Sequence, residues 1–105
     1  MKFIIKTLIL TALISSQSIA GPHYLSGKIT NLTSIRGGLL IMLDSGVPDN
    51  CVNTPSGWMM VRQEDTAMTS VVLAVWLSGS KQGTVYTEPH VPGQYCTLTQ
   101  FDPVN

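Results

Sequence analysis

The first twenty residues limit what the rest of the chain can fold into. The segment MKFIIKTLILTALISSQSIA has two lysines near its start, then an apolar run, then small residues at the two positions that a signal peptidase reads, Ser18 and Ala20. This is the layout of a secretory signal peptide, and its apolar run is shorter than the about 20 residues that span a bilayer. We therefore expect cleavage of residues 1–20 and a single domain over residues 21–105 that is exported, either secreted or periplasmic.

The expected mature chain is small and slightly acidic. Removing 20 of the 105 residues leaves 85, near the lower end of what one core stabilises without a cross-link. Four Lys and Arg stand against six Asp and Glu, which gives a formal charge of −2. Because the mature chain has no basic cluster and no long apolar segment, we expect no nucleic-acid partner and no membrane span after cleavage.

Two cysteines provide the expected cross-link. Cys51 and Cys96 are the only cysteines of the chain, and in an exported protein we expect them to form a disulfide. The bridge would close a loop of roughly 46 residues, for which the loop-entropy model gives a stabilisation of about 4 kcal/mol. That is comparable to the whole net stability of a small domain, so the disulfide is expected to hold the fold closed.

Alternation of apolar and polar residues and the turn signals between them predict five strands. The pair Gly37-Gly38 indicates a tight hairpin between the first two strands. The segment VPDNCVNTPSG, residues 47–57, is expected to be a loop with Cys51 in its middle. The expected strands are residues 24–34, 39–43, 58–61, 83–87 and 95–101.

The segment 66–77 is expected to be a helix. Glu64 and Asp65 before it suit a helix N-terminus as caps, and Ser78-Gly79 provides a stop after it. Its valines and Trp76 also favour a strand, so helix and strand both stay open for this segment. In the helical alternative, the inward stripe would be Met68, Val71, Val72, Val75 and Trp76.

The order strand-strand-strand-helix-strand-strand predicts a mainly β chain with one helix, a five-stranded OB-like barrel with one disulfide. The succession GGLLIMLDS, a loop cysteine, GWMMV, LSG, GTVYT and YCTLTQF also resembles a group of small exported bacterial proteins. More distantly it resembles the B subunits of AB-type toxins of the subtilase and pertussis-like kind. Those subunits are OB-folds that form rings and bind glycans. The resemblance therefore implies a glycan- or receptor-binding subunit that works either as a homo-oligomer or beside a separate catalytic chain.

Candidate catalytic and metal-binding residues are sparse. His23 and His90 have no partner at the spacing of a metal site, and both are expected on the surface. Glu64 and Asp65 are adjacent and would not face each other on a helix, so capping accounts for both. We therefore expect no enzymatic activity, no metal site and no cofactor.

Aromatic side chains are the best candidates for ligand binding, since any of Tyr24, Trp58, Trp76, Tyr86, Tyr95 and Phe101 could supply a stacking face for a sugar. Tyr86 and Tyr95 flank the loop EPHVPGQ, where an exposed pair would form a platform for a ligand. We expect a non-catalytic binding module whose partner is a protein or a glycan. The alternative is a periplasmic inhibitor or immunity protein that blocks a toxin or a hydrolase by surface contact.

Overall fold

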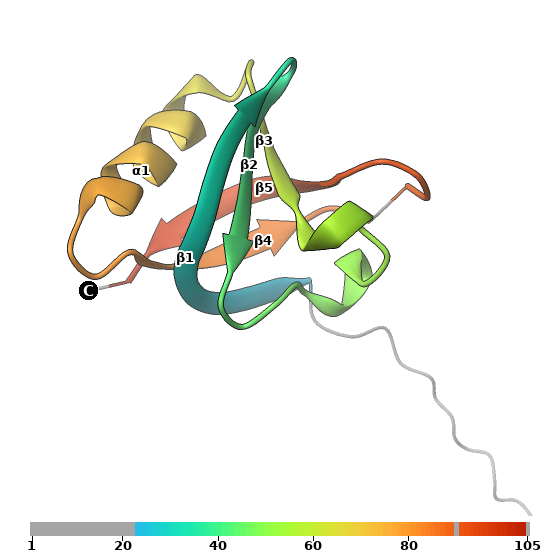
Figure 1. Cartoon of the computed structure of the whole chain (residues 1–105), viewed down its shortest axis with the longest axis horizontal. Helices are drawn as coiled ribbons and strands as arrows, with labels where there is room; N and C mark the ends of the chain where they lie inside the picture. Colours follow the sequence, from blue (N-terminus) through green and yellow to red (C-terminus); the bar gives the residue numbers. More distant parts are fainter. Residues whose placement is uncertain (1–22, 90, 105) are drawn as a thin grey trace, which may run out of the picture.

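The computed structural model describes residues 23–89 and 91–104, which form five strands and one α-helix (Figure 1). The signal peptide expected over residues 1–20 lies outside the described residues. The prediction of a mainly β chain with one helix is confirmed, and the segment 66–77 is a helix rather than a strand. The elements are β1 (Tyr24–Ile35), β2 (Gly38–Leu43), the 3₁₀ turns η2 (Asp49–Cys51) and η3 (Pro55–Gly57), β3 (Met59–Arg62), α1 (Thr66–Leu77), β4 (Gln82–Thr87) and β5 (Cys96–Pro103).

Closure of the sheet depends on β1, which pairs with two different neighbours. Its second half, from Ile29 onward, pairs antiparallel with β2, whereas its first half, from Tyr24 to Lys28, pairs antiparallel with β4. β2 pairs with β3, β3 lies parallel to the start of β5, and β5 pairs antiparallel with β4. The five strands thus close into a ring in the order β1-β2-β3-β5-β4, and Figure 1 shows the bend of β1 that makes this possible.

Two glycines allow backbone segments to approach closely, at the turn after β2 and at β3. A Cβ at Gly27, near the bend of β1, would collide with the side chain of Ser45. At Gly38 a Cβ would collide with the backbone oxygen of Val61 on β3, and the φ of +156° there also favours glycine. Gly37, with a φ of +96°, lies in the turn between β1 and β2, so the hairpin predicted at the glycine pair is confirmed.

The core lies inside the ring of strands, and α1 packs against β3 and β5 at one side of it (Figure 1). α1 contributes the buried Val72 and Val75, and the less buried Met68, Val71 and Trp76 pack against the same core, as the helical stripe predicted. Among the described residues, no helix combines the length and the apolar character needed to cross a membrane. The strands contribute Ile29, Ile41, Leu43, Met59, Val61, Val85, Leu98 and Phe101.

The start of α1 differs from the prediction. Asp65 occupies the N-cap position, but its side chain makes no capping hydrogen bond. Its carboxylate instead accepts a hydrogen bond from Arg62 Nε at 3.4 Å. The φ of −86° and ψ of 67° at Asp65 lie outside the extended backbone of an ordinary N-cap, and Arg62 competes for the carboxylate. The prediction that Glu64 and Asp65 cap the helix through their side chains is therefore wrong.

A disulfide holds the loop between β2 and β3, residues 47–57, which we call the stapled loop. Cys51 in η2 is bonded to Cys96 at the start of β5, 45 residues further along the chain, with a Cα–Cα distance of 5.5 Å. Both cysteines are fully buried. The predicted bridge is confirmed, and a disulfide is compatible with an extracellular or periplasmic location.

Side-chain hydrogen bonds attach the stapled loop at two further points. The hydroxyl of Thr54, which is buried, donates to Trp58 O at 2.6 Å and accepts from the backbone N–H of Cys96 at 2.9 Å. Asn50 and Thr87 also contact each other: Thr87 Oγ1 donates to Asn50 Oδ1 at 2.7 Å, and Asn50 Nδ2 donates to Thr87 O at 3.3 Å. The irregular loop is therefore tied to both β4 and β5 by specific partners.

Candidate binding site

The two tyrosines predicted as a ligand platform lie on different parts of the sheet. Tyr86 is the fifth residue of β4, whereas Tyr95 immediately precedes Cys96 at the start of β5, and both are half-buried. Within residues 23–89 and 91–104, the ring contacts of Tyr86 are with Tyr24 and His23, and none joins it to Tyr95. A binding role for Tyr86 and Tyr95 stays a prediction, but the ring partner of Tyr86 is on β1.

Three aromatic side chains, His23, Tyr24 and Tyr86, form what we call the aromatic cluster. Tyr24 and Tyr86 are register partners on the antiparallel strands β1 and β4, so their side chains leave the same face of the sheet. Their ring centroids are 5.7 Å apart with an interplanar angle of 37°, and the His23 ring meets Tyr24 edge-on at 5.8 Å. Tyr24 is 50% exposed and His23 is also exposed, as predicted for that histidine, so the cluster is open to solvent.

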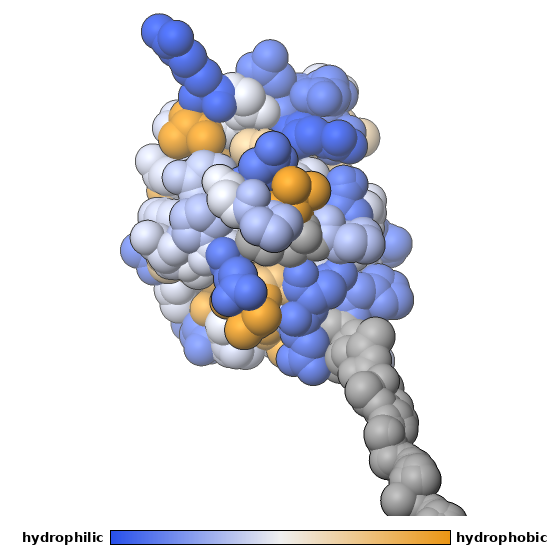
Figure 2. Space-filling view, turned by 90° about the vertical axis from the view of Figure 1, so that its right-hand side faces the viewer, coloured by the Kyte–Doolittle hydropathy of each residue, from blue (hydrophilic) through white to orange (hydrophobic). Residues whose placement is uncertain are grey.

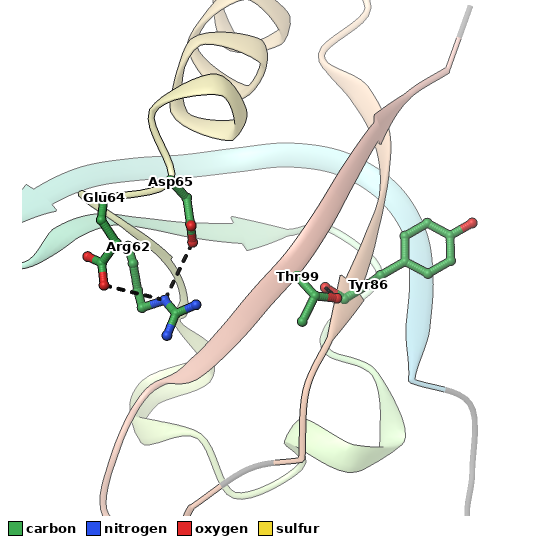
Figure 3. Close-up of polar contacts among 5 residues, drawn as sticks. All are labelled: Arg62, Glu64, Asp65, Tyr86 and Thr99. Carbon is green, nitrogen blue, oxygen red and sulfur yellow. Dashed lines mark hydrogen bonds and ion pairs between the residues drawn. The ribbon is translucent and has the colours of Figure 1, made fainter.

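Backbone contacts fix the base of the aromatic cluster. The carbonyl of His23 accepts a hydrogen bond from the backbone N–H of Thr87 at 2.9 Å, and the Thr87 hydroxyl oxygen, whose hydrogen is shared between this carbonyl and Asn50 Oδ1, lies 3.1 Å away. Thr99 on β5 donates to Tyr86 O at 3.3 Å, and Figure 3 shows the Tyr86 ring projecting away from Arg62, Glu64 and Asp65. The rings therefore stand on anchored strands, which lowers the ordering cost when a ligand binds.

Polar side chains surround the two tyrosines on the same face. Ser26, which is exposed, and Thr84, which is buried, are the register pair two positions along β1 and β4, and their hydroxyl oxygens lie 2.6 Å apart. Gln100, which is exposed, lies opposite Tyr86 on β5. Hydroxyl and amide groups donate and accept hydrogen bonds. This face can thus combine stacking on flat apolar rings with hydrogen bonds to a polyhydroxylated ligand.

A concave region, separate from the aromatic cluster, lies between the start of α1 and β5, with a volume of about 470 Å³. Its apolar lining includes Met68, Val71 and Phe101, and its polar lining includes the two carboxylates Glu64 and Asp65. Arg62 Nε lies 3.9 Å from Glu64 Oε2 and 3.4 Å from Asp65 Oδ2, as drawn in Figure 3. Each carboxylate thus already has a cationic partner at the solvent-exposed rim, where such pairs contribute little to stability.

Titratable and metal-ligating groups are scattered in the part of the chain that the structure describes. No group of three or more His, Cys, Asp or Glu side chains that could hold a metal ion occurs over residues 23–89 and 91–104. His90, which was expected on the surface, lies outside the described residues. The aromatic cluster is therefore the most distinctive arrangement of functional groups on the described surface.

Sequence reasoning did not place Tyr24 or His23 beside Tyr86. The strand that carries Tyr24 was predicted, but its pairing with β4 was not, because local alternation does not show which strands become neighbours. Ring closure of the sheet is what brings Tyr24 beside Tyr86, 62 positions further along the chain.

Comparison of the chain with protein families, with curated proteins and with solved structures gives no match.

Proposed function

We propose that the chain is an exported, non-catalytic binding module that recognises a glycan, free or on a receptor, through the aromatic cluster. The observation that carries this proposal is the exposed register pair Tyr24 and Tyr86, with ring centroids 5.7 Å apart. A tyrosine presents a flat apolar face and a polar hydroxyl. A pyranose has the complementary surface, since C–H groups cover one face of the sugar ring and hydroxyls line its rim.

The fold and the disulfide support this proposal. The ring order β1-β2-β3-β5-β4, with α1 between β3 and β4, agrees with an OB-like barrel, whose sheet face and neighbouring loops commonly bind oligosaccharides or oligonucleotides. Tyr86 stands near the end of β4, close to the loop that leads to β5. The buried Cys51–Cys96 bridge favours an oxidising compartment, where extracellular glycans are encountered.

A glycan array probed with the purified, exported protein tests the proposal. We expect binding to a subset of glycans, and we expect Tyr24→Ala and Tyr86→Ala each to weaken it about tenfold, because each removes one stacking ring. Tyr86→Phe keeps the ring and should retain most of the affinity. Tyr95→Ala should have a smaller effect than Tyr24→Ala, since the Tyr95 ring does not contact Tyr86.

Val52→Ala is the matched control, because Val52 is 72% exposed and lies on the stapled loop. It should leave glycan binding unchanged. The proposal would be contradicted if the wild-type protein bound no glycan on a broad array. It would also be contradicted if Tyr24→Ala and Tyr86→Ala each bound glycans as tightly as the wild type does. Binding of a hydrolase or a toxin chain in place of a glycan would favour the inhibitor alternative.

A further inference from the structure

α1 has no polar outer face of the kind that surface helices normally present to water. Its twelve residues, TAMTSVVLAVWL, include no charged side chain. A helix that lies on the surface of a small protein is normally apolar on one side and charged on the other, whereas a helix that is apolar all round is normally buried. Here only Val72 and Val75 are buried. The exposed residues are uncharged and mostly small or apolar: Thr66, Ala67, Ser70, Leu73, Ala74 and Leu77.

The exposed apolar residues of the described chain gather on and beside α1. Of the seven large hydrophobic residues that are exposed, Leu73 and Leu77 are on the helix itself, and Leu77 is 81% exposed. Ile35 lines a groove of about 380 Å³ along one flank of α1, and Val104 lines a groove of about 410 Å³ along the other flank. We call Ile35, Leu73, Leu77 and Val104, together with the small exposed residues of α1, the helix face.

The side of the molecule away from α1 has a different surface. Figure 2 views the side that lies to the right in Figure 1, where the 3₁₀ turns and the loop before β5 are found, and it is mostly hydrophilic with small, separate apolar spots. Exposed large hydrophobics in these segments are Val52 and Val91, one in each. Isolated apolar residues are ordinary on protein surfaces, whereas a contiguous apolar region points to an interaction site.

The two ends of α1 carry opposite charge. Arg62, Glu64 and Asp65 stand together before the helix and sum to one negative charge. Lys81 stands beyond the other end, where its ammonium donates to Trp76 O at 2.6 Å and lies 4.6 Å from the centroid of the Trp76 ring. Two copies of α1 placed side by side in opposite directions would bring each acidic end next to a basic end. The dipoles of the two antiparallel helices would also attract each other.

We propose that the helix face is the contact surface of a two-fold symmetric homodimer in which the two copies of α1 pack antiparallel. A two-fold interface uses the same patch on both copies, so a patch with one acidic end and one basic end complements itself. The small residues Ala67, Ser70 and Ala74 allow helix axes to approach to about 8 Å. A parallel arrangement of the two helices would place acidic ends beside acidic ends.

The dimer proposal does not depend on the proposed glycan binding, and such a dimer would leave both glycan-binding surfaces accessible. In Figure 1, α1 lies on the opposite side of the molecule from the start of β1 and the end of β4, where Tyr24 and Tyr86 stand. Both aromatic clusters of a dimer would remain open, and a surface that displays many glycans could be bound at two points with increased avidity.

Sedimentation equilibrium of the purified, exported protein over a concentration series tests the dimer. We expect the mass to approach twice that of one chain. Leu77→Glu should raise the dimer dissociation constant about tenfold or more, because it places a charge in the apolar contact. Leu77→Ala removes apolar area without adding charge and should raise the constant by a smaller factor, which keeps the test valid if the Glu variant folds poorly.

A charge exchange tests the antiparallel direction. Lys81→Glu alone should weaken the dimer, and Lys81→Glu combined with Glu64→Lys should restore part of the lost affinity, because each pair of ends again carries opposite charge. Val52→Glu, on the far side of the molecule, is the control and should leave the mass unchanged. A monomer at the highest concentration, an assembly larger than two copies, or a dimer insensitive to the Leu77 changes would overturn the proposal, whatever the glycan array shows.

Discussion

The stapled loop, tied to β4 and β5, and α1, packed against β3 and β5, are held to the sheet by different physical means. The loop has little regular structure, and it is fixed by a disulfide at Cys51 and by side-chain hydrogen bonds of Asn50 and Thr54. α1 satisfies its own backbone hydrogen bonds and needs only an apolar stripe, centred on Val72 and Val75, to attach it to the core. The loop thus depends on a few specific partners, whereas the helix depends on packing.

This difference explains where the molecule can offer a free surface. An irregular segment must find a partner for each buried polar group, since an unpaired one is costly, so its side chains are used internally. A helix leaves its outer side unused by the fold, and in α1 that side has remained apolar. If the comparison is correct, changes in the stapled loop should affect stability most, and changes on the outside of α1 should affect association instead.

Loss of the disulfide is expected to have the largest effect. The double variant Cys51→Ala with Cys96→Ala should lower the free energy of unfolding by about 4 kcal/mol, because the denatured chain regains the freedom of the closed loop. Urea denaturation monitored by circular dichroism measures this. Wild-type protein in a thiol reductant should unfold at the same urea concentration as the variant. A loss below about 1 kcal/mol would show that the loop is held mainly by its hydrogen bonds.

Thr54→Val tests those hydrogen bonds with little change in shape. The substitution leaves the Trp58 carbonyl and the Cys96 N–H without the buried hydroxyl that pairs with both. We expect the free energy of unfolding to fall by about 3 kcal/mol, since each unpaired buried group costs about 1–3 kcal/mol. Thr54→Ser keeps the hydroxyl and serves as the control, so a loss in Thr54→Ser equal to that in Thr54→Val would assign the effect to the methyl group instead.

Local features of the sequence were sufficient to predict most of the elements. Apolar alternation placed the strands close to their observed bounds, and the Gly37-Gly38 pair placed the first hairpin. These features act over a few residues, which is the range over which backbone geometry and side-chain direction are set. The disulfide was also predictable, because the chain has only two cysteines and an expected signal peptide.

Contacts between distant segments were not predictable in the same way. Tyr24 meets Tyr86 because β1 turns from β2 to β4 near Gly27, and local alternation does not encode that exchange of partners. The hydroxyl of Thr54 bridges Trp58, just before β3, and the start of β5 only once the ring has closed. The capping prediction at Asp65 failed for a related reason, since Arg62 is a competing partner whose position depends on how β3 leads into α1.

Val72, which is buried, and Leu77, which is exposed, lie on the same helix and provide the finest test of the comparison. Val72→Ala removes two buried carbon atoms from the core and should lower the free energy of unfolding by about 2 kcal/mol. Leu77→Ala removes more carbon atoms, yet Leu77 is 81% exposed, so in dilute solution it should change the stability by less than about 0.5 kcal/mol. Urea denaturation at a protein concentration below dimerisation measures both. A Leu77→Ala loss as large as that of Val72→Ala would mean that the outer side of α1 serves the fold of one chain, and the separation drawn between stability and association would then fail.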